Sequence, residues 1–450
     1  MSRNRSLWTI GAALLVIIIV ILVLAPGAWA ASKYKTLHKF TGGADGELPD
    51  ADLLLDQAGN LYGTTAYGGA ASIYGGTVFK LAANAHGGWT KSVLYNFCSV
   101  TNCADGKNPY SSLVFDQAGN LYGSTLGGGS GPGCTYSNGC GAIFELTPNT
   151  QGGWTERVLY NFCSLTNCGD GFGPQRGLVF DAKGSLYGTT EAGGNSGCGG
   201  NGCGVVFQLT PNQDGSWTES ALYSFCSVTN CGDGYDPQCR LVFDAKGSLY
   251  GTTDAGGNSG CRGNGCGVVF QLTPNADGSW KEKVIHTFTG ADGGTPSAGL
   301  IFDQAGKNLY GTAELGGNFS QCNGNGCGLV FQLTPNADGS WREKVLHHFT
   351  GGKDGGESIA DLIFDQGGNL YGTATLGGNL SYCGGGGCGI VFKLVPNPKG
   401  GWNEIVLHDF ADHPGDIPIA GLVFDPAGNV YGTTNGDQVA TFGSVFEITP

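Results

Sequence analysis

The stretch Gly59-Asn60-Leu61-Tyr62-Gly63-Thr64-Thr65 decides the fold, because its Leu/Val-Tyr-Gly core returns at a nearly fixed interval. Successive tyrosines of this core are 60, 65, 63, 60, 61 and 60 residues apart. The seven are Tyr62, Tyr122, Tyr187, Tyr250, Tyr310, Tyr371 and Tyr431. A period this regular indicates one supersecondary unit that is copied seven times.

Each copy predicts four short strands. In the copy around Tyr187, the strands are expected at 177–181, 185–190, 204–209 and 217–225. These segments are rich in β-branched and aromatic residues, and Gly, Asn, Asp and Pro separate them as turn residues do. No helical period follows residue 30. Four antiparallel strands in one period are typical of a propeller blade.

The two ends of the repeated region complement each other. Residues 34–40 match the fourth-strand pattern, whereas the last copy stops after its third strand at 444–448. The N-terminal strand would therefore complete the last blade and leave no open sheet edge. We predict an all-β, closed seven-bladed β-propeller over residues 31–450, with four antiparallel strands in each blade.

Residues 1–30 have the features of a targeting segment. Arg3 and Arg5 precede an apolar stretch over 7–24, and Ala28-Trp29-Ala30 matches the small-x-small cleavage pattern of a signal peptide. The stretch is also long enough to remain as a membrane anchor, so both alternatives stay open. Either way we expect a secreted or extracytoplasmic protein that meets the membrane only through this segment.

The composition excludes some classes of partner. The chain has 450 residues with 36 acidic and 22 basic side chains, a net charge of −14. This balance argues against nucleic acid and anionic membrane surfaces as ligands. The 84 glycines show no Gly-X-Y period and lie at turns, as many short hairpins require. We expect a monomer without a cofactor.

Sixteen of the 17 cysteines form eight close pairs. In an exported chain such pairs indicate disulfides, whereas a metal site would need Cys-x2-Cys spacing or a nearby His. The pairs are Cys98–Cys103, Cys134–Cys140, Cys163–Cys168, Cys198–Cys203, Cys226–Cys231, Cys261–Cys266, Cys322–Cys327 and Cys383–Cys388. Cys239 remains as a free thiol, unless it exchanges with Cys226 or Cys231.

Loop lengths distinguish two faces of the predicted ring. The first-to-second and third-to-fourth strand connections are nearly invariant, and we call their side the constant face. The second-to-third and fourth-to-first connections vary in length and contain all eight cysteine pairs, so their side is the variable face. Loops held by a rigid scaffold often bind ligands. Resistance to proteases is the other explanation for such disulfides.

An aspartate followed by Gly recurs on the variable face, eight residues before the first strand-one Leu of six copies. The six are Asp45, Asp105, Asp170, Asp233, Asp292 and Asp354. Carboxylates around a channel mouth could hold calcium or a polyol. The alternative is an Asp-Gly turn in which the carboxylate bonds its own loop.

Aromatic residues also recur, and packing explains them best. One ring in each copy precedes the strand-four Phe by two residues and is expected between sheets with its polar tip bonded. The rings are His38, Tyr95, Tyr160, Tyr223, His286, His347 and His408. Six tryptophans open the fourth strands, where we expect them to cover blade edges.

Few residues break the repetition on the variable face. Arg176, Arg240 and Cys239 stand just before strand one, and the two arginines could bind a carboxylate or a phosphate. We predict no catalytic residue, because no nucleophile or acid-base partner is visible beside them. The sequence favours a binding module for a glycan or a surface protein. A propeller hydrolase or lyase with its site at the channel mouth is the alternative.

The repeated phrases also resemble a known family. Gly59-Asn60-Leu61-Tyr62-Gly63-Thr64-Thr65 and Gly202-Cys203-Gly204-Val205-Val206-Phe207 are similar to the GloVer tandem repeat of bacterial exported proteins, over roughly residues 34–450. The resemblance implies a surface or secreted protein without an assigned biochemical activity. The C-terminal anchors of that family have no counterpart here, so any attachment would use the N-terminal segment. A likeness to NHL and lactonase-type blades concerns the fold alone.

Overall fold

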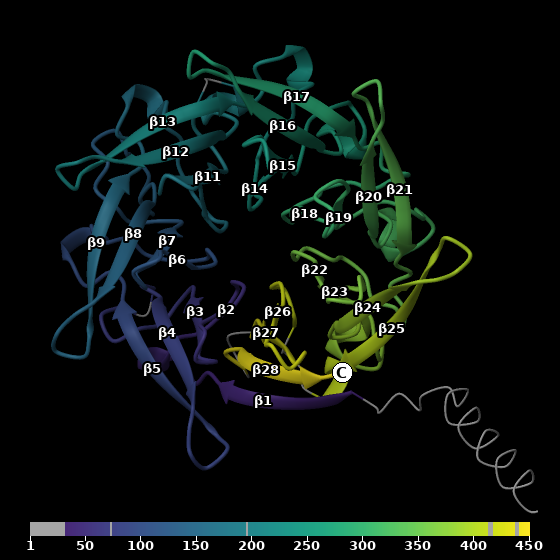
Figure 1. Cartoon of the computed structure of the whole chain (residues 1–450), viewed down its shortest axis with the longest axis horizontal. Coiled ribbons are helices and arrows are strands. Elements are labelled where there is room, and N and C mark those ends of the chain that lie inside the picture. The colour runs from purple at the N-terminus through teal and green to yellow at the C-terminus, as the bar shows by residue number, and fades with distance from the viewer. Residues whose placement is uncertain (1–31, 73, 195–196, 413–416, 437–440) are drawn as a thin grey trace, which may run out of the picture.

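The computed structural model describes residues 32–450 except 73, 195–196, 413–416 and 437–440. The predicted signal peptide or anchor at 1–30 lies outside the described residues. Seven four-stranded antiparallel sheets surround a central axis (Figure 1), which confirms the seven-bladed propeller. Blades 1 to 6 are β2–β5, β6–β9, β10–β13, β14–β17, β18–β21 and β22–β25, and blade 7 combines β26–β28 with β1.

The strands occupy equivalent places in every blade (Figure 1). The innermost are β2 (Leu54–Leu55), β6 (Val114–Phe115), β10 (Val179–Phe180), β14 (Val242–Phe243), β18 (Ile301–Phe302), β22 (Ile363–Phe364) and β26 (Val423–Phe424). The second are β3 (Leu61–Thr65), β7 (Leu121–Thr125), β11 (Leu186–Thr190), β15 (Leu249–Thr253), β19 (Leu309–Ala313), β23 (Leu370–Ala374) and β27 (Val430–Thr434).

The third and fourth strands are longer. The third are β4 (Thr77–Ala83), β8 (Ala142–Pro148), β12 (Val205–Pro211), β16 (Val268–Pro274), β20 (Leu329–Pro335), β24 (Ile390–Pro396) and β28 (Ser444–Thr449). The outermost are β5 (Trp89–Asn96), β9 (Trp154–Asn161), β13 (Trp217–Ser224), β17 (Trp280–Thr287), β21 (Trp341–His348), β25 (Trp402–Asp409) and β1 (Lys33–Lys39).

Short 3-10 turns lie in the connections of the variable face. They are η1 (Gly43–Asp45), η2 (Thr101–Cys103), η3 (Thr166–Cys168), η4 (Cys198–Gly200), η5 (Thr229–Cys231), η6 (Cys261–Gly263), η7 (Cys322–Gly324), η8 (Cys383–Gly385) and η9 (Phe410–Asp412). Within the described residues, no helix is long and apolar enough to span a membrane.

The N-terminal strand closes the ring as predicted. β1 pairs antiparallel with β28, from Lys33 opposite Thr449 to Lys39 opposite Ser444. The pairing joins the first described residues to the last strand, so the edge of β28 is hydrogen-bonded and is not left open. Blade 7 is consequently as complete as the other six.

Aromatic contacts hold neighbouring blades together. The strand-four Phe of each blade meets the strand-three Phe of the next edge to face, as Phe225 meets Phe270 with ring centroids 5.0 Å apart. Tyr187 packs edge to face against Phe243 of the next blade, and its hydroxyl donates to Asp181 of its own turn at 3.1 Å. The recurring tyrosine is therefore a scaffold residue that joins two blades.

The glycine that follows this tyrosine has a steric reason. A Cβ atom at Gly188 would lie 2.7 Å from Cζ of Phe207 on the adjacent strand. The next residue, Thr189, donates from its hydroxyl to the carbonyl of Cys239 in the next blade at 3.0 Å. Thr433 makes the corresponding bond to Ala51 at 3.3 Å, so this series of bonds also crosses the closure. The Tyr-Gly-Thr motif thus encodes contact between blades.

Candidate functional site

Each of the six predicted aspartates is held by the outer strand that precedes it or by its own loop. Asp105 is buried, and it accepts hydrogen bonds from the Tyr95 hydroxyl at 2.9 Å and the Ser99 backbone at 2.8 Å. Asp170 and Asp233 make the same two contacts in the next two blades. The structure therefore places these carboxylates between blades and does not bring the six together at the channel mouth.

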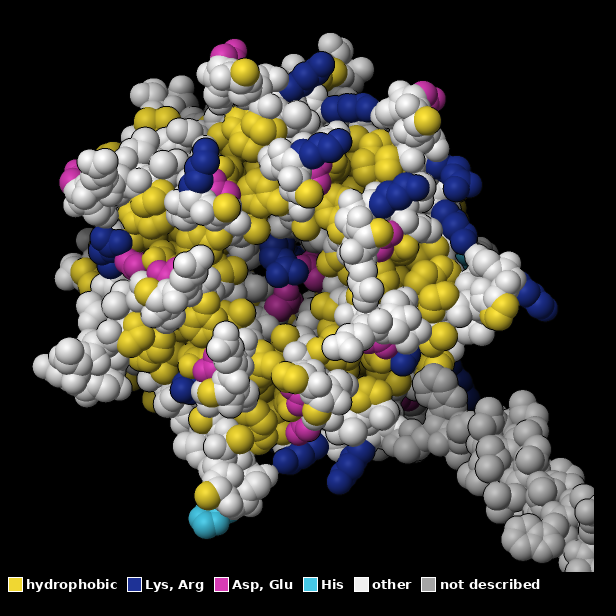
Figure 2. All heavy atoms as spheres, viewed as in Figure 1, with side chains coloured by type: hydrophobic (Ala, Val, Ile, Leu, Met, Phe, Trp, Pro, Cys, Tyr) yellow, Lys and Arg dark blue, Asp and Glu magenta, His cyan; other side chains and the backbone are white. Residues whose placement is uncertain are grey.

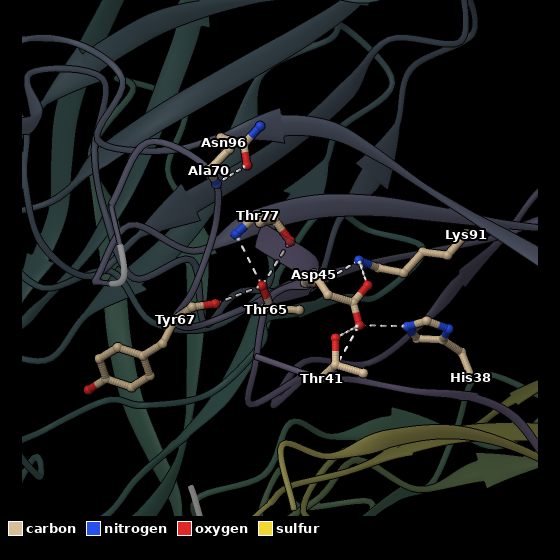
Figure 3. A network of polar contacts seen from close by, with 9 residues as sticks. All are labelled: His38, Thr41, Asp45, Thr65, Tyr67, Ala70, Thr77, Lys91 and Asn96. Carbon is tan, nitrogen blue, oxygen red and sulfur yellow. Dashed lines mark hydrogen bonds and ion pairs between the residues drawn. The ribbon is translucent and has the colours of Figure 1, made fainter. Parts of the chain in front are cut away.

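A His replaces the Tyr at the other three positions. Asp45 contacts Nε2 of His38 at 3.2 Å, and Lys91 of the next blade approaches its Oδ1 at 2.9 Å (Figure 3). Burial would raise the pKa of Asp45, but the bonds to His38 and Lys91 together lower it. His286 and His347 face Asp292 and Asp354 at 3.4 and 3.8 Å.

Five glutamates of the neighbouring blades complete these interfaces. They are Glu156, Glu219, Glu282, Glu343 and Glu404, each two residues after the strand-four Trp. Their Oε1 atoms are buried without a hydrogen-bond partner among the described residues. Burial raises the pKa of each glutamate, and for Glu219 burial together with the charge of Asp170 raises it to about 8. Lys91 occupies this position at the interface between blades 7 and 1.

All eight predicted cysteine pairs are disulfide-bonded. They fasten the loops of the variable face. The sulfurs of Cys198–Cys203 and Cys226–Cys231 lie within 4.8 Å of one another, so two separate connections of blade 3 meet there. Cysteines make up the clusters of potential metal ligands found among the described residues, and no group of three carboxylates converges in the same way.

Cys239 is a free thiol and is completely buried. Its Sγ accepts a hydrogen bond from the Thr252 backbone at 3.1 Å. Ser111 stands at the same place in blade 2, where its hydroxyl accepts from the Ser124 backbone at 2.7 Å. Burial raises the pKa of the Cys239 thiol to about 12. A neutral thiol thus stands at a position that is Ser in blade 2 and Ala in blades 1, 5, 6 and 7.

The two predicted arginines lie in the central channel. Arg240 forms an ion pair with Asp361 of blade 6 at 2.9 Å, and Asp361 also accepts from the Gly299 backbone at 2.6 Å. Arg176 donates from Nε to the carbonyl of Gln238 at 3.1 Å. Both guanidinium groups therefore bond to protein groups of the channel while remaining partly exposed.

Sequence reasoning missed the acids that accompany these arginines. Asp52, Arg240 and Asp361 all stand one residue before the strand-one Leu of their blades. Asp52 accepts from the Gly421 backbone at 2.6 Å, across the closure of the ring. A comparison of this single position across the seven copies would have shown two acids and one base among small residues.

These residues close the channel, and we call Asp50, Asp52, Arg176, Arg240 and Asp361 the channel plug. The cavity that they share has a volume of about 20 Å³, which accommodates one water molecule. Figure 2 shows basic and acidic side chains inside the central opening. Burial raises the pKa of Asp50 to about 8, although Arg176 opposes this shift. No substrate-sized space exists within the plug.

Apolar side chains line the channel beyond the plug. A cavity of about 560 Å³ is bordered by strand-one residues of blades 1 to 5, including Phe115, Phe180 and Phe302, and it reaches Arg240. The strands that line it belong to the repeat itself. This cavity therefore has an aliphatic and aromatic wall with few polar groups.

A second cavity lies among the loops of the variable face, and we call it the blade 4–5 pocket. Its volume is about 510 Å³, within the usual range of ligand sites. Asp236 and Asp254 lie in it together with Asn264, Asn325 and Phe319, whose side chain is 50% exposed. The pocket could not be predicted from the sequence, since loops from two blades form it.

The two carboxylates of this pocket have perturbed protonation. Burial and the nearby Asp236 raise the pKa of Asp254 to about 8, and Arg176 partly opposes the shift. Burial also raises the pKa of Asp236, which accepts a hydrogen bond from Gln238 at 3.0 Å. The pocket thus combines two acids whose pKa values are raised, two amides and an exposed aromatic ring.

Two solved structures are similar to this chain. One chain, described as the extracellular domain of a hybrid two-component system from B. thetaiotaomicron, is 12% identical with a TM-score of 0.51; the match covers 91% of this chain. This protein spans only 39% of that chain. The other is a Trichoderma reesei enzyme of Carbohydrate-Active Enzymes Family AA12, described as a calcium structure, with 11% identity, 94% and 97% coverage and a TM-score of 0.40.

The family comparison is more specific. No curated protein matches the sequence. A family model described as the Gloeobacter/Verrucomicrobia repeat matches residues 27–200, 135–382 and 263–450. These overlapping matches extend over all seven blades and confirm the resemblance that the repeated phrases suggest. The chain therefore belongs to the Gloeobacter/Verrucomicrobia repeat family.

Proposed function

We propose that this protein is an exported binding module that holds a glycan in the blade 4–5 pocket of its variable face. The observation that carries the proposal is the lining of this 510 Å³ pocket, where a half-exposed Phe319 lies beside the amides of Asn264 and Asn325 and two carboxylates. An aromatic face with neighbouring amides and acids offers both stacking and hydrogen bonds to a sugar ring.

Several features support an extracytoplasmic setting for this activity. Eight disulfides are typical of proteins in oxidising compartments. The disulfides Cys261–Cys266 and Cys322–Cys327 fasten the two loops that carry Asn264 and Phe319. A loop held in this way loses less entropy when a ligand binds. The N-terminal segment would provide either secretion or anchoring.

The hydrolase or lyase alternative has one observation in its favour. Asp50 and Asp254 both have a pKa of about 8, as general acids often do. Asp50, however, lies in the channel plug, whose cavity admits about one water molecule. Of these two acids, Asp254 borders a space large enough for a substrate, so an acid catalyst with this raised pKa would act in the same blade 4–5 pocket.

A glycan array probed with labelled residues 31–450 tests the proposal. We expect binding to a restricted set of glycans, and a loss of at least about tenfold in affinity in Phe319→Ala because the stacking surface is removed. Leu380 is the matched control, since it occupies the same position in the loop of blade 6 and is 45% exposed.

The outcomes are distinct. Binding that is lost in Phe319→Ala and kept in Leu380→Ala supports the blade 4–5 pocket. Equal behaviour of the two variants, or the absence of any bound glycan, overturns the proposal. The bound glycans are also incubated with the protein and analysed for cleavage, and turnover would replace the binding module by the hydrolase or lyase.

A further inference from the structure

We infer that the ligand of the blade 4–5 pocket is a saccharide with a free amino group, whose ammonium binds between Asp254 and Asp236. This inference rests on the proposed function, because it specifies the glycan that the pocket would hold.

Asp254 offers an unused acceptor at the base of the pocket. The residue directly follows β15, and its Oδ1 atom is buried without a hydrogen-bond partner among the described residues. Glu191 and Glu314 stand at the same position in blades 3 and 5, where Gln175 and Ser297 donate to them. A buried carboxylate oxygen without a donor is costly, so a donor from the ligand would relieve it.

The surrounding charges favour a cationic donor. The negative charges of Asp236 and Glu314 raise the pKa of Asp254, and the positive charge of Arg176 opposes this shift. Arg176 also faces Asp50 in the channel plug, so its charge is shared among several acids. An ammonium beside these acids would lower the raised pKa of Asp254 and favour its carboxylate form, which a neutral hydroxyl would not do, so the ammonium would bind better.

A metal ion fits this site less well than an ammonium. Calcium takes about six to eight oxygen ligands. Among the described residues, no three carboxylates place oxygens within 4.8 Å of one another, and the converging groups consist of cysteines. An ammonium needs only two or three acceptors, which Asp254 Oδ1 and the adjacent Asp236 can provide.

The rest of the pocket fits a sugar ring that carries this group. Phe319 and Leu315 form an apolar side, and Thr295, Asn264 and Asn325 add hydrogen-bonding groups. Arg262 lies at the pocket and bonds to Asn325 across the two blades, so its positive charge disfavours a polyamine. One ammonium on an otherwise neutral saccharide satisfies both the acids and the arginine.

The test compares three matched disaccharides by calorimetry at pH 6 with residues 31–450. The first, the glucosamine dimer, joins one glucosamine to one glucose by a β-1,4 link and carries a single amino group; the other two replace the glucosamine by N-acetylglucosamine or by glucose. We expect the glucosamine dimer to bind at least about tenfold more tightly than the other two, the effect of one charge-assisted hydrogen bond. Equal affinities overturn the inference.

Two variants assign the selectivity to Asp254. In Asp254→Asn the preference for the amine is expected to disappear, while Glu191→Gln at the same position of blade 3 keeps it. Melting curves of both variants verify that they fold. A variant Asp254→Asn that still prefers the amine would contradict the assignment.

The inference and the proposed function fail in different ways. If the array finds neutral glycans whose binding needs Phe319 and shows no preference for amines, the proposed function stands and the inference is wrong. If no glycan binds and the glucosamine dimer gives no heat, both are wrong.

Discussion

Arg240 illustrates how a single departure from the repeat changes the molecule. Its partner Asp361 belongs to a blade two places further around the ring, and the two atoms meet at 2.9 Å inside the channel. The positive charge of Arg240 also balances Asp52, whose pKa is raised by burial and by the charge of Asp361. The residue before the strand-one Leu has a small side chain in most blades. In blades 1, 4 and 6 it is charged, and these three charges interact.

Replacing Arg240 by Met should destabilise the protein. Asp361 and Asp52 would keep their burial and lose the nearby cation, which costs several kcal/mol for a fully buried pair. The Arg240 side chain is 38% exposed, so we expect a smaller decrease of about 2 kcal/mol in the free energy of unfolding.

Urea unfolding at pH 7 measures this change. Lys246→Met, on an exposed turn of the same blade, is the control. The double variant Arg240→Met/Asp361→Asn should recover part of the loss, because the unpaired charge is removed. Unchanged stability in Arg240→Met would show that the ion pair does not stabilise the ring.

Cys239 should be unreactive in the folded protein. Its burial and its pKa of about 12 leave almost no accessible thiolate at neutral pH. We expect a thiol reagent to modify no cysteine in native, unreduced protein and about one per chain after unfolding, because the remaining sixteen are bonded. Cys239→Ser should fold with similar stability, since Ser111 has this place in blade 2. Rapid modification of native protein would contradict this account.

At the scale of elements, the repeated contact between blades is a triad of an aromatic tip, a loop aspartate and a glutamate from the next outer strand. Tyr160, Asp170 and Glu219 form one example. Outer strands of all blades have a β-bulge near the aromatic residue, such as the shift opposite Val206 and Phe207 in β12. The bulge reorients the ring toward the loop of its own blade.

These glutamates predict a pH dependence of stability. Their pKa values of about 7 to 8 in the folded protein exceed the ordinary value of 4.5, so the folded state binds more protons than the unfolded state. The stabilisation is complete below about pH 4.5 and is lost as the pH rises through 7 to 8. Each half-buried glutamate should contribute about 1 kcal/mol after allowance for solvent screening.

Groups with a lowered pKa act in the opposite direction, among them Asp45, Asp292 and His347. Burial lowers the pKa of His347 below 6.5, so its protonation destabilises the folded state at acidic pH. We therefore expect the melting temperature to be highest near about pH 5 to 6 and to fall toward pH 8. Glu219→Gln/Glu404→Gln should raise the melting temperature at pH 8 and flatten this dependence. Asp214→Asn, on an exposed turn, is the control. A melting temperature that increases steadily from pH 5 to pH 8 would exclude these glutamates as the dominant groups.

Periodicity is sufficient to predict the strands and insufficient to predict these contacts. Segment 217–225 is recognisable as a strand because Trp217 and Phe225 recur at fixed spacing. Nothing in that spacing shows that Glu219 approaches Asp170 of the preceding blade, because the placement of one blade on the next depends on how the ring closes. The blade 4–5 pocket is hidden for the same reason, since Asp254 and Phe319 are 65 residues apart in different loops.

At the scale of the whole molecule, closure depends on β1. Its pairing with β28 gives blade 7 its fourth strand, and Tyr34 stacks on His408 of blade 6 at 3.9 Å. The complementary ends were predictable because a fourth-strand pattern precedes the first copy and is missing after the last. The charged closure of the channel was not predictable, since it is formed by side chains from blades that are distant in sequence.

Removing residues 1–40 should open the ring. The edge of β28 would be exposed, and the expected result is association or a large drop in melting temperature. Size-exclusion chromatography and thermal melting measure both effects, and a variant lacking only residues 1–31 is the control. A peptide of residues 32–41 should restore the monomer by adding the strand. A monomer without residues 1–40 that melts normally would show that closure is dispensable.

The most direct test of the account is the hydrogen-exchange footprint of the tightest glycan from the array. If the glycan binds the variable face, amide exchange should slow at residues 254–265 and 315–325, which contain the loops of the blade 4–5 pocket. Exchange at the constant-face turns 181–185 and 212–216 should not change. Protection confined to those turns, or spread equally over all seven blades, would contradict the claim that the ligand binds where the repeat is broken.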